Sequence, residues 1–153
     1  MRRSFFWEVG IAFSILVIGV AANFDVRPTY KDLEATVLQE PFSDGRRALL
    51  YRWDGVVLRN CTGALRREVR QGGETFYLPD RTFTWIPSGR WSGEVRQNFV
   101  VAVGLGDFEG RLSNGLATYH VTQVSHCNRI QAWFGYAIEE AYPPVSFLIS
   151  NQS

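Results

Sequence analysis

The chain has only two cysteines, almost no lysine and a formal net charge of only +1. Two cysteines, Cys61 and Cys127, allow a single intramolecular disulfide. Lys31 is the only lysine, so arginine carries nearly all of the positive charge. From Asp25 to the end of the chain, 14 basic residues balance 14 acidic ones. This neutrality argues against nucleic acid as the main partner.

Long apolar runs are also scarce, and the one present is at the amino terminus. Phe5 to Ala22 would rise about 27 Å as a helix, close to the hydrocarbon thickness of a bilayer. Arg2 and Arg3 precede it, which places the amino terminus in the cytoplasm. We therefore predict that residues 1–24 are a single-pass membrane anchor and that the rest of the chain is periplasmic or extracellular.

The same segment has an alternative interpretation as a cleaved signal peptide. Glu8 divides the run, and Val9 to Ala22 has the length of a signal-peptide core. Small residues at Ala21 and Ala22 offer a cleavage site. In that case the chain is secreted.

After residue 24 the sequence lacks any long amphipathic helix and shows strand patterns instead. Residues 25–32 are expected to be a short stalk, because they have no periodicity and include Arg27-Pro28. Residues 33–153 form the predicted domain. Asp54-Gly55 and Gly72-Gly73 predict two hairpin turns, and Pro79-Asp80 is expected to end a strand.

The longest predicted strand runs from Leu116 to Cys127. Tyr119, Val121, Gln123, Ser125 and Cys127 would share one face of it. The segment from Ile130 to Tyr136 could be a strand or a short helix, and Val145 to Ile149 predicts the last strand. Repeated short strands with glycine-rich turns are typical of an all-β sandwich, with a small β-barrel as the alternative.

Cys61 and Cys127 lie near the ends of two predicted strands, so we expect a disulfide that joins one sheet to the other. This pair resembles the inter-sheet bridge of the immunoglobulin fold. The chain has Phe76 where that fold has a core tryptophan, and Ser125 where it has tyrosine two residues before the second cysteine. The resemblance therefore implies an immunoglobulin-like architecture without membership of a named family.

No catalytic or metal-binding motif is recognisable. His120 and His126 would be about 20 Å apart on an extended strand, too far apart to share a metal ion, and we predict no cofactor. The neighbouring acids Asp107 and Glu109, and Glu139 and Glu140, are the candidates for a hydrolase. A secreted small hydrolase is therefore one alternative function, and a virus or phage structural protein is another.

The candidate interaction surface is rich in arginine. Arg90 and Trp91 lie in a predicted loop, and arginine and tryptophan are common in interaction hot spots. Arg66, Arg67 and Arg70 form a second basic group. The sequence thus predicts a non-catalytic, membrane-anchored module that acts by contact with an unidentified protein.

Overall fold

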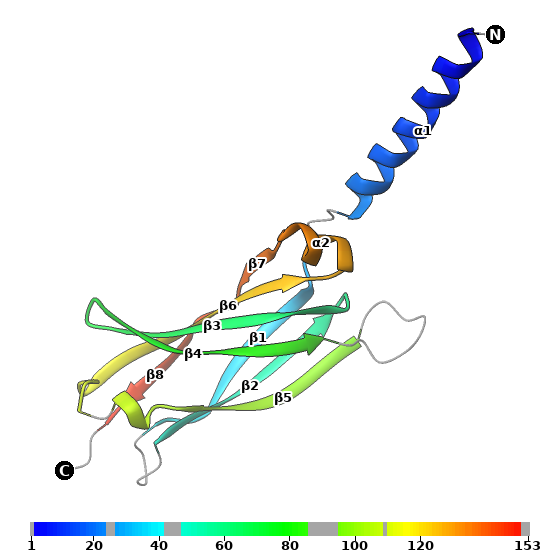
Figure 1. Ribbon diagram of the computed structural model, residues 1–153. Coiled ribbons are helices and arrows are strands. Elements are labelled where there is room, and N and C mark those ends of the chain that lie inside the picture. Colours follow the sequence, from blue (N-terminus) through cyan, green and yellow to red (C-terminus); the bar gives the residue numbers. More distant parts are fainter. Residues whose placement is uncertain (1, 24–26, 42–46, 86–94, 109, 151–153) are drawn as a thin grey trace.

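A computed structural model describes residues 2–23, 27–41, 47–85, 95–108 and 110–150. Strands dominate, and they follow one helix at the amino terminus (Figure 1). The elements are α1 (Arg2–Asn23), β1 (Tyr30–Gln39), β2 (Ala48–Val57), β3 (Cys61–Gln71), β4 (Glu74–Trp85), β5 (Val95–Gly104), the 3-10 turn η2 (Gly106–Phe108), β6 (Gly115–His126), α2 (Arg129–Phe134), β7 (Ile138–Ala141) and β8 (Val145–Ile149).

The strands form two antiparallel sheets that pack face to face. One sheet has the order β1-β2-β5, and the other has the order β4-β3-β6-β7, with β8 also paired to β6. The sheets lie one above the other in Figure 1. The prediction of a β-sandwich is confirmed. The alternative of a closed barrel is wrong, because no pairing among the described strands joins the two sheets.

The Asp54-Gly55 turn does not form, and β2 continues through both residues. Gly55 pairs with Gln97 of β5. A Cβ atom on Gly55 would lie 2.7 Å from Leu33 Cδ1 of β1. Glycine therefore allows Leu33 to pack closely against β2, and the turn signal was misleading because glycine also serves this purpose.

The Gly72-Gly73 hairpin is confirmed, and it joins β3 to β4. Both glycines have positive φ, 59° and 89°, the conformation that a tight turn requires. Strand β4 does not end at Pro79. The register with β3 shifts there instead, and proline is tolerated because β4 is an edge strand.

Alternation along β6 is as predicted. Tyr119, Val121, Gln123 and Ser125 are buried, whereas the residues between them are more exposed. The apolar side chains of this face pack against those of the other sheet. The largest fully buried members of the core are Tyr119, Phe147, Leu49, Leu105 and Ile149.

The sandwich begins earlier than expected, and its last connection contains a helix. β1 starts at Tyr30, and Thr29 is already buried, within the stretch that we expected to be a stalk. The segment after β6 forms the short helix α2. Asn128 caps its amino end by accepting a hydrogen bond from the Gln131 amide, and Gly135 ends it with φ 66°.

Helix α1 points away from the sandwich in Figure 1. Its described apolar side chains, among them Trp7, Phe13 and Leu16, are exposed. No helix within the described residues is long and apolar enough to cross a membrane. The structure thus provides a helix where one was predicted, but it does not support the prediction that Phe5 to Ala22 spans a bilayer.

Candidate functional site

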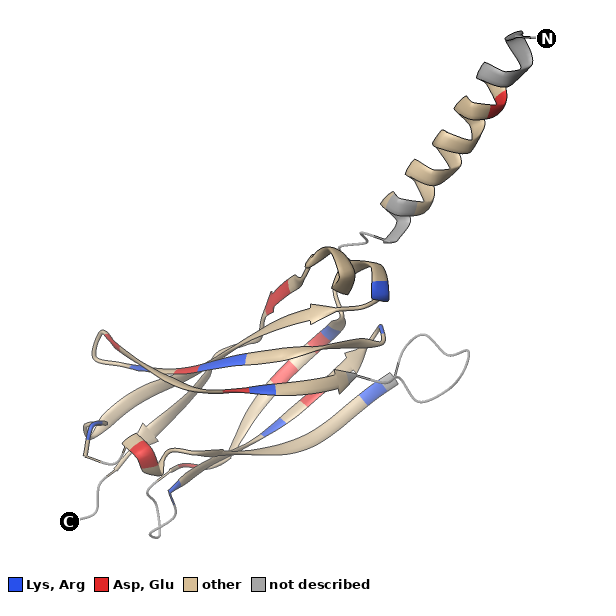
Figure 2. Cartoon of the chain, viewed as in Figure 1, with Lys and Arg blue, Asp and Glu red and all other residues tan. Residues whose placement is uncertain are grey.

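The predicted basic surface divides between the two faces of β3. Arg66 and Arg70 are exposed. Arg66 Nη1 lies 3.6 Å from Glu139 Oε1, and Arg70 forms an ion pair with Glu68. Each charge is therefore partly neutralised by a neighbouring acid. Charged residues of both signs are spread over the strands (Figure 2). Arg90 and Trp91 lie outside the described residues.

Arg67 is not part of that surface, contrary to the prediction. It lies opposite Val121 of β6, on the face of β3 that packs against the other sheet, and only 9% of it is exposed. Its guanidinium donates to the Pro79 carbonyl, with 3.1 Å from Nε to the oxygen. Pro79 lies at the register shift between β3 and β4, where its carbonyl is not paired in the ladder with β3.

Cys61 and Cys127 form the predicted disulfide. However, they do not join the two sheets. Cys61 begins β3 and Cys127 follows β6, and these strands are neighbours in one sheet. The two strands lie so close together here that a Cβ atom on Gly63 would collide with the Val124 carbonyl oxygen. The bridge therefore fastens one end of a strand pair.

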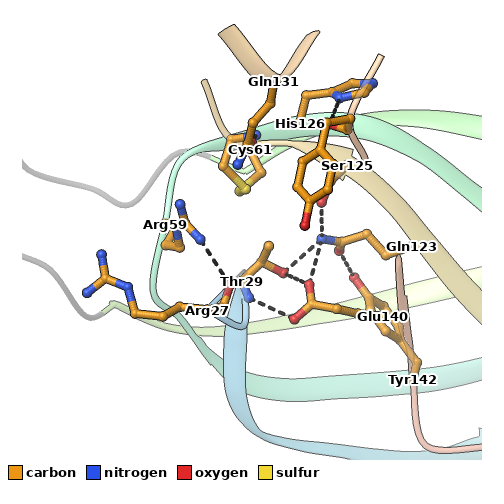
Figure 3. Close-up of a disulfide and its surroundings, with 12 residues drawn as sticks. Arg27, Thr29, Arg59, Cys61, Gln123, Ser125, His126, Gln131, Glu140 and Tyr142 are labelled. Carbon is orange, nitrogen blue, oxygen red and sulfur yellow. Dashed lines mark hydrogen bonds between the residues drawn. A yellow bond between two sulfur atoms is a disulfide. The ribbon is translucent and has the colours of Figure 1, made fainter. Parts of the chain in front are cut away.

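A hydrogen-bonded polar cluster lies between the sheets beside the disulfide (Figure 3). Gln123 donates from Nε2 to Thr29 Oγ1 at 2.8 Å and to Ser125 Oγ at 3.2 Å, and its Oε1 accepts from the Tyr142 hydroxyl at 2.5 Å. The Glu140 carboxylate accepts from the amide and the hydroxyl of Thr29. These bonds tie β1, β6 and β7 together.

Helix α2 is fixed to the same end of the sandwich by a second buried amide. Gln131 is fully buried, and its Oε1 accepts from the Cys127 amide at 2.7 Å. His126 Nδ1 lies 2.7 Å from the Tyr136 carbonyl oxygen. The helix is thus held on both sides by polar contacts.

Two aromatic side chains project from this fixed helix. Trp133 is 83% exposed and Phe134 is 64% exposed, and their ring centroids are 5.4 Å apart. A shallow open pocket of about 410 Å³ lies beside the disulfide, and Arg129 and Ala132 are among its lining residues. Exposed aromatic residues on a fixed helix are suited to contact with another molecule.

The sequence did not single out Trp133 or Phe134 as site residues, because the segment was equally compatible with a strand. Gln123 and Ser125 did carry a signal. Both are polar residues on the predicted buried face of a strand, and buried polar groups require partners.

A second, more enclosed pocket of about 190 Å³ lies between the sheets. Its lining includes Tyr51, Trp53, Arg67, Arg81, Phe99 and Tyr142. The aromatic rings contact one another edge to face, with centroid distances of 5.4 Å from Tyr51 to Trp53 and 4.6 Å from Trp53 to Tyr142. Burial raises the pKa of the Tyr51 hydroxyl far above its ordinary value, and burial also raises that of Tyr119.

The candidate acids and histidines are dispersed. Glu139 faces outward towards Arg66, whereas Glu140 faces the polar cluster, so the two carboxylates of this pair point to opposite sides of β7. Asp107 lies in η2, and Glu109 lies outside the described residues. Burial lowers the pKa of His120 below its ordinary value, and the nearby Arg70 lowers it further.

No group of three or more potential metal ligands was found among the residues that the structure describes. No protein-family model and no curated protein matches the chain.

Proposed function

We propose that the protein is an extracytoplasmic interaction module that acts by protein contact at the end of the sandwich that carries the disulfide and α2. The observation that carries the proposal is the exposure of Trp133 and Phe134 on a helix that is otherwise fixed in place. Rigid aromatic side chains lose little conformational entropy on binding and bury a large apolar area. Such a surface is suited to a protein partner.

The sandwich itself is of the immunoglobulin-like kind in this proposal, and its strand order supports that view. Immunoglobulin sandwiches place strands A, B and E in one sheet and C, F and G in the other. With β1 taken as strand A, β1, β2 and β5 correspond to A, B and E. In the other sheet β3, β6 and β7 correspond to C, F and G, and β4 is an additional strand that lies between C and E in the sequence. The disulfide departs from that fold, because it links neighbouring strands.

Helix α1 is the targeting segment in this proposal. A helix that begins with two arginines and is mostly apolar after Glu8 fits an export signal, either retained at the membrane or cleaved. Export would place Cys61 and Cys127 in a compartment where a disulfide persists. The intact mass of the chain recovered from membrane and secreted fractions distinguishes a retained segment from a cleaved one.

Photocrosslinking of the full chain tests the contact surface. The photocrosslinking residue benzoylphenylalanine replaces Trp133 in one variant and Tyr77 in a control variant. Both variants are expressed in cells of the organism whose genome encodes the protein. Tyr77 is comparably exposed at 74%, but it lies on β4 near the Gly72-Gly73 turn. We expect a discrete adduct from position 133 and none from position 77.

A third variant adds Phe134→Ala to the crosslinker at position 133. If the two aromatic residues form one contact surface, the adduct weakens without a change in unfolding free energy, because Phe134 is largely exposed. Identical adducts from positions 133 and 77, or no adduct from position 133, would contradict the proposal. If α1 is retained in the membrane fraction but position 133 gives no adduct, the targeting role of α1 would stand and the contact surface on α2 would not.

A further inference from the structure

The interior of the sandwich contains a guanidinium whose hydrogen-bond partners among the described residues are all neutral. Arg67 is the one charged residue among the buried residues that the structure describes. It donates to the carbonyl of Pro79. By contrast, Arg66, Arg70 and Arg96 each pair with a carboxylate on the outer faces of the sheets. No described carboxylate forms an ion pair with Arg67.

A buried charge of this kind is costly unless an opposite charge accompanies it. Removing an ion from water is strongly unfavourable, and a neutral carbonyl offsets only part of that cost. A guanidinium also has five N–H donors in a fixed plane, which match the two oxygens of a carboxylate. A carboxylate beside Arg67 would therefore be held by paired hydrogen bonds in the plane of the guanidinium.

Arg67 lines the 190 Å³ pocket between the sheets, so space for an anion is present beside it. A cavity of about 150 Å³ is known to admit benzene in another protein. The pocket is therefore large enough for one small ring and is too small for most drug-sized ligands, which need about 300 Å³ or more. Tyr51, Trp53 and Tyr142 supply an aromatic wall for such a ring.

A second arginine lines the pocket and reaches solvent. Arg81 on the edge strand β4 is exposed, and it pairs in register with Leu65 of β3, another lining residue. Phe83 of β4 and Phe99 of β5 also line the pocket, so its walls include the edge strands of both sheets. The positive charge of Arg81 would attract an anion on its way into the pocket.

We propose that this pocket binds a small organic carboxylate with one aromatic or similarly flat apolar ring. The carboxylate pairs with Arg67, the ring lies against Tyr51, Trp53 and Tyr142, and Arg81 assists entry. A monoanion fits better than a phosphate dianion, because a single buried cation neutralises one negative charge. The inference is independent of the contact surface on α2.

Calorimetric titration of the full chain with benzoate tests the proposal, with benzyl alcohol and acetate as matched ligands. Benzyl alcohol keeps the ring but lacks the charge, and acetate keeps the carboxylate but lacks the ring. We expect benzoate to bind at millimolar concentration or below, and each matched ligand to bind at least tenfold more weakly. Equal binding of benzoate and benzyl alcohol, or no binding of benzoate, would overturn the proposal.

Variants locate the site. Arg67→Met is expected to weaken benzoate binding at least tenfold, whereas Arg66→Gln, on the outer face of the same strand, leaves it unchanged. If Arg67→Met does not fold, Arg81→Gln and Val101→Phe take its place, because Arg81 is exposed and Val101 is partly exposed. The first should weaken binding severalfold, and the second should abolish it by filling the pocket. Unchanged affinity in both variants would refute the assignment.

Discussion

The two halves of the sandwich interior are built in different ways. The apolar half contains Leu49, Val69, Val103, Phe147 and Ile149, all buried. The polar half, beside α2 and the disulfide, contains Thr29, Gln123, Ser125, Glu140 and Tyr142. Strand β6 runs through both halves and changes from apolar to polar inward-facing residues along its length.

This difference shows that two kinds of interaction hold the same pair of sheets together. Apolar contact is non-directional and is roughly proportional to the area buried, so it stabilises the fold with little dependence on exact partners. Hydrogen bonds between buried groups contribute less net free energy, but they require particular partners at particular distances. The polar half therefore fixes the geometry of the end that carries α2.

Removal of the disulfide should have the largest effect, and mainly on the polar half. In the Cys61→Ala, Cys127→Ala double variant, the unfolded chain loses a long closed loop, which corresponds to about 4 kcal/mol of stability. Denaturant unfolding measures this loss. Amide exchange should accelerate near His126 more than near Tyr119, and uniform acceleration along β6 would argue against separate halves.

Truncation in the apolar half should have the next largest effect. Leu49 is fully buried, so Leu49→Ala is expected to cost about 3 kcal/mol through lost burial and a residual cavity. Leu148→Ala is the matched control, because the same side chain is 46% exposed there. Urea unfolding of both variants checks the contrast, and similar losses would contradict it.

Disruption of the polar cluster should cost less than truncation in the apolar half. Gln123→Leu keeps most of the side-chain volume but removes the side-chain amide. Tyr142 then has no Gln123 oxygen to donate to, and Glu140 no longer accepts from Gln123. We expect the free energy of unfolding to fall by about 2 kcal/mol. Thr122→Val on the opposite face of β6 is the control. A Gln123→Leu variant as stable as the wild type would show that this half is also held mainly by apolar contact.

The smallest effect at neutral pH is expected for Tyr51→Phe, next to the 190 Å³ pocket. Burial raises the pKa of Tyr51, and Tyr119 raises it further, so the folded chain keeps the hydroxyl neutral where the unfolded chain ionises. Stability is thus complete below about pH 10, the ordinary pKa of tyrosine, and falls as the pH rises above it. Tyr51→Phe should reduce this slope in unfolding measured from pH 9 to 11. An unchanged slope would show that Tyr51 does not contribute to the pH dependence of stability.

Several elements could be predicted because their signals are local. Alternation predicted the two faces of β6, and Gly72-Gly73 predicted its hairpin. Asp54-Gly55 gave the same kind of local signal, but the packing of Leu33 against Gly55 determined the outcome. Trp133 was missed because a short segment of mixed polarity fits helix and strand equally well.

The sequence by itself determined the amino-terminal apolar segment, the all-β class and the single possible disulfide, since these follow from composition and short-range periodicity. Only the tertiary structure decided that the disulfide stays within one sheet and that Arg67 faces inward. Both depend on which strands pair and in which register, and a shift of one residue moves every side chain to the other face. Register is set by contacts between residues far apart in the chain, so local pattern does not reveal it.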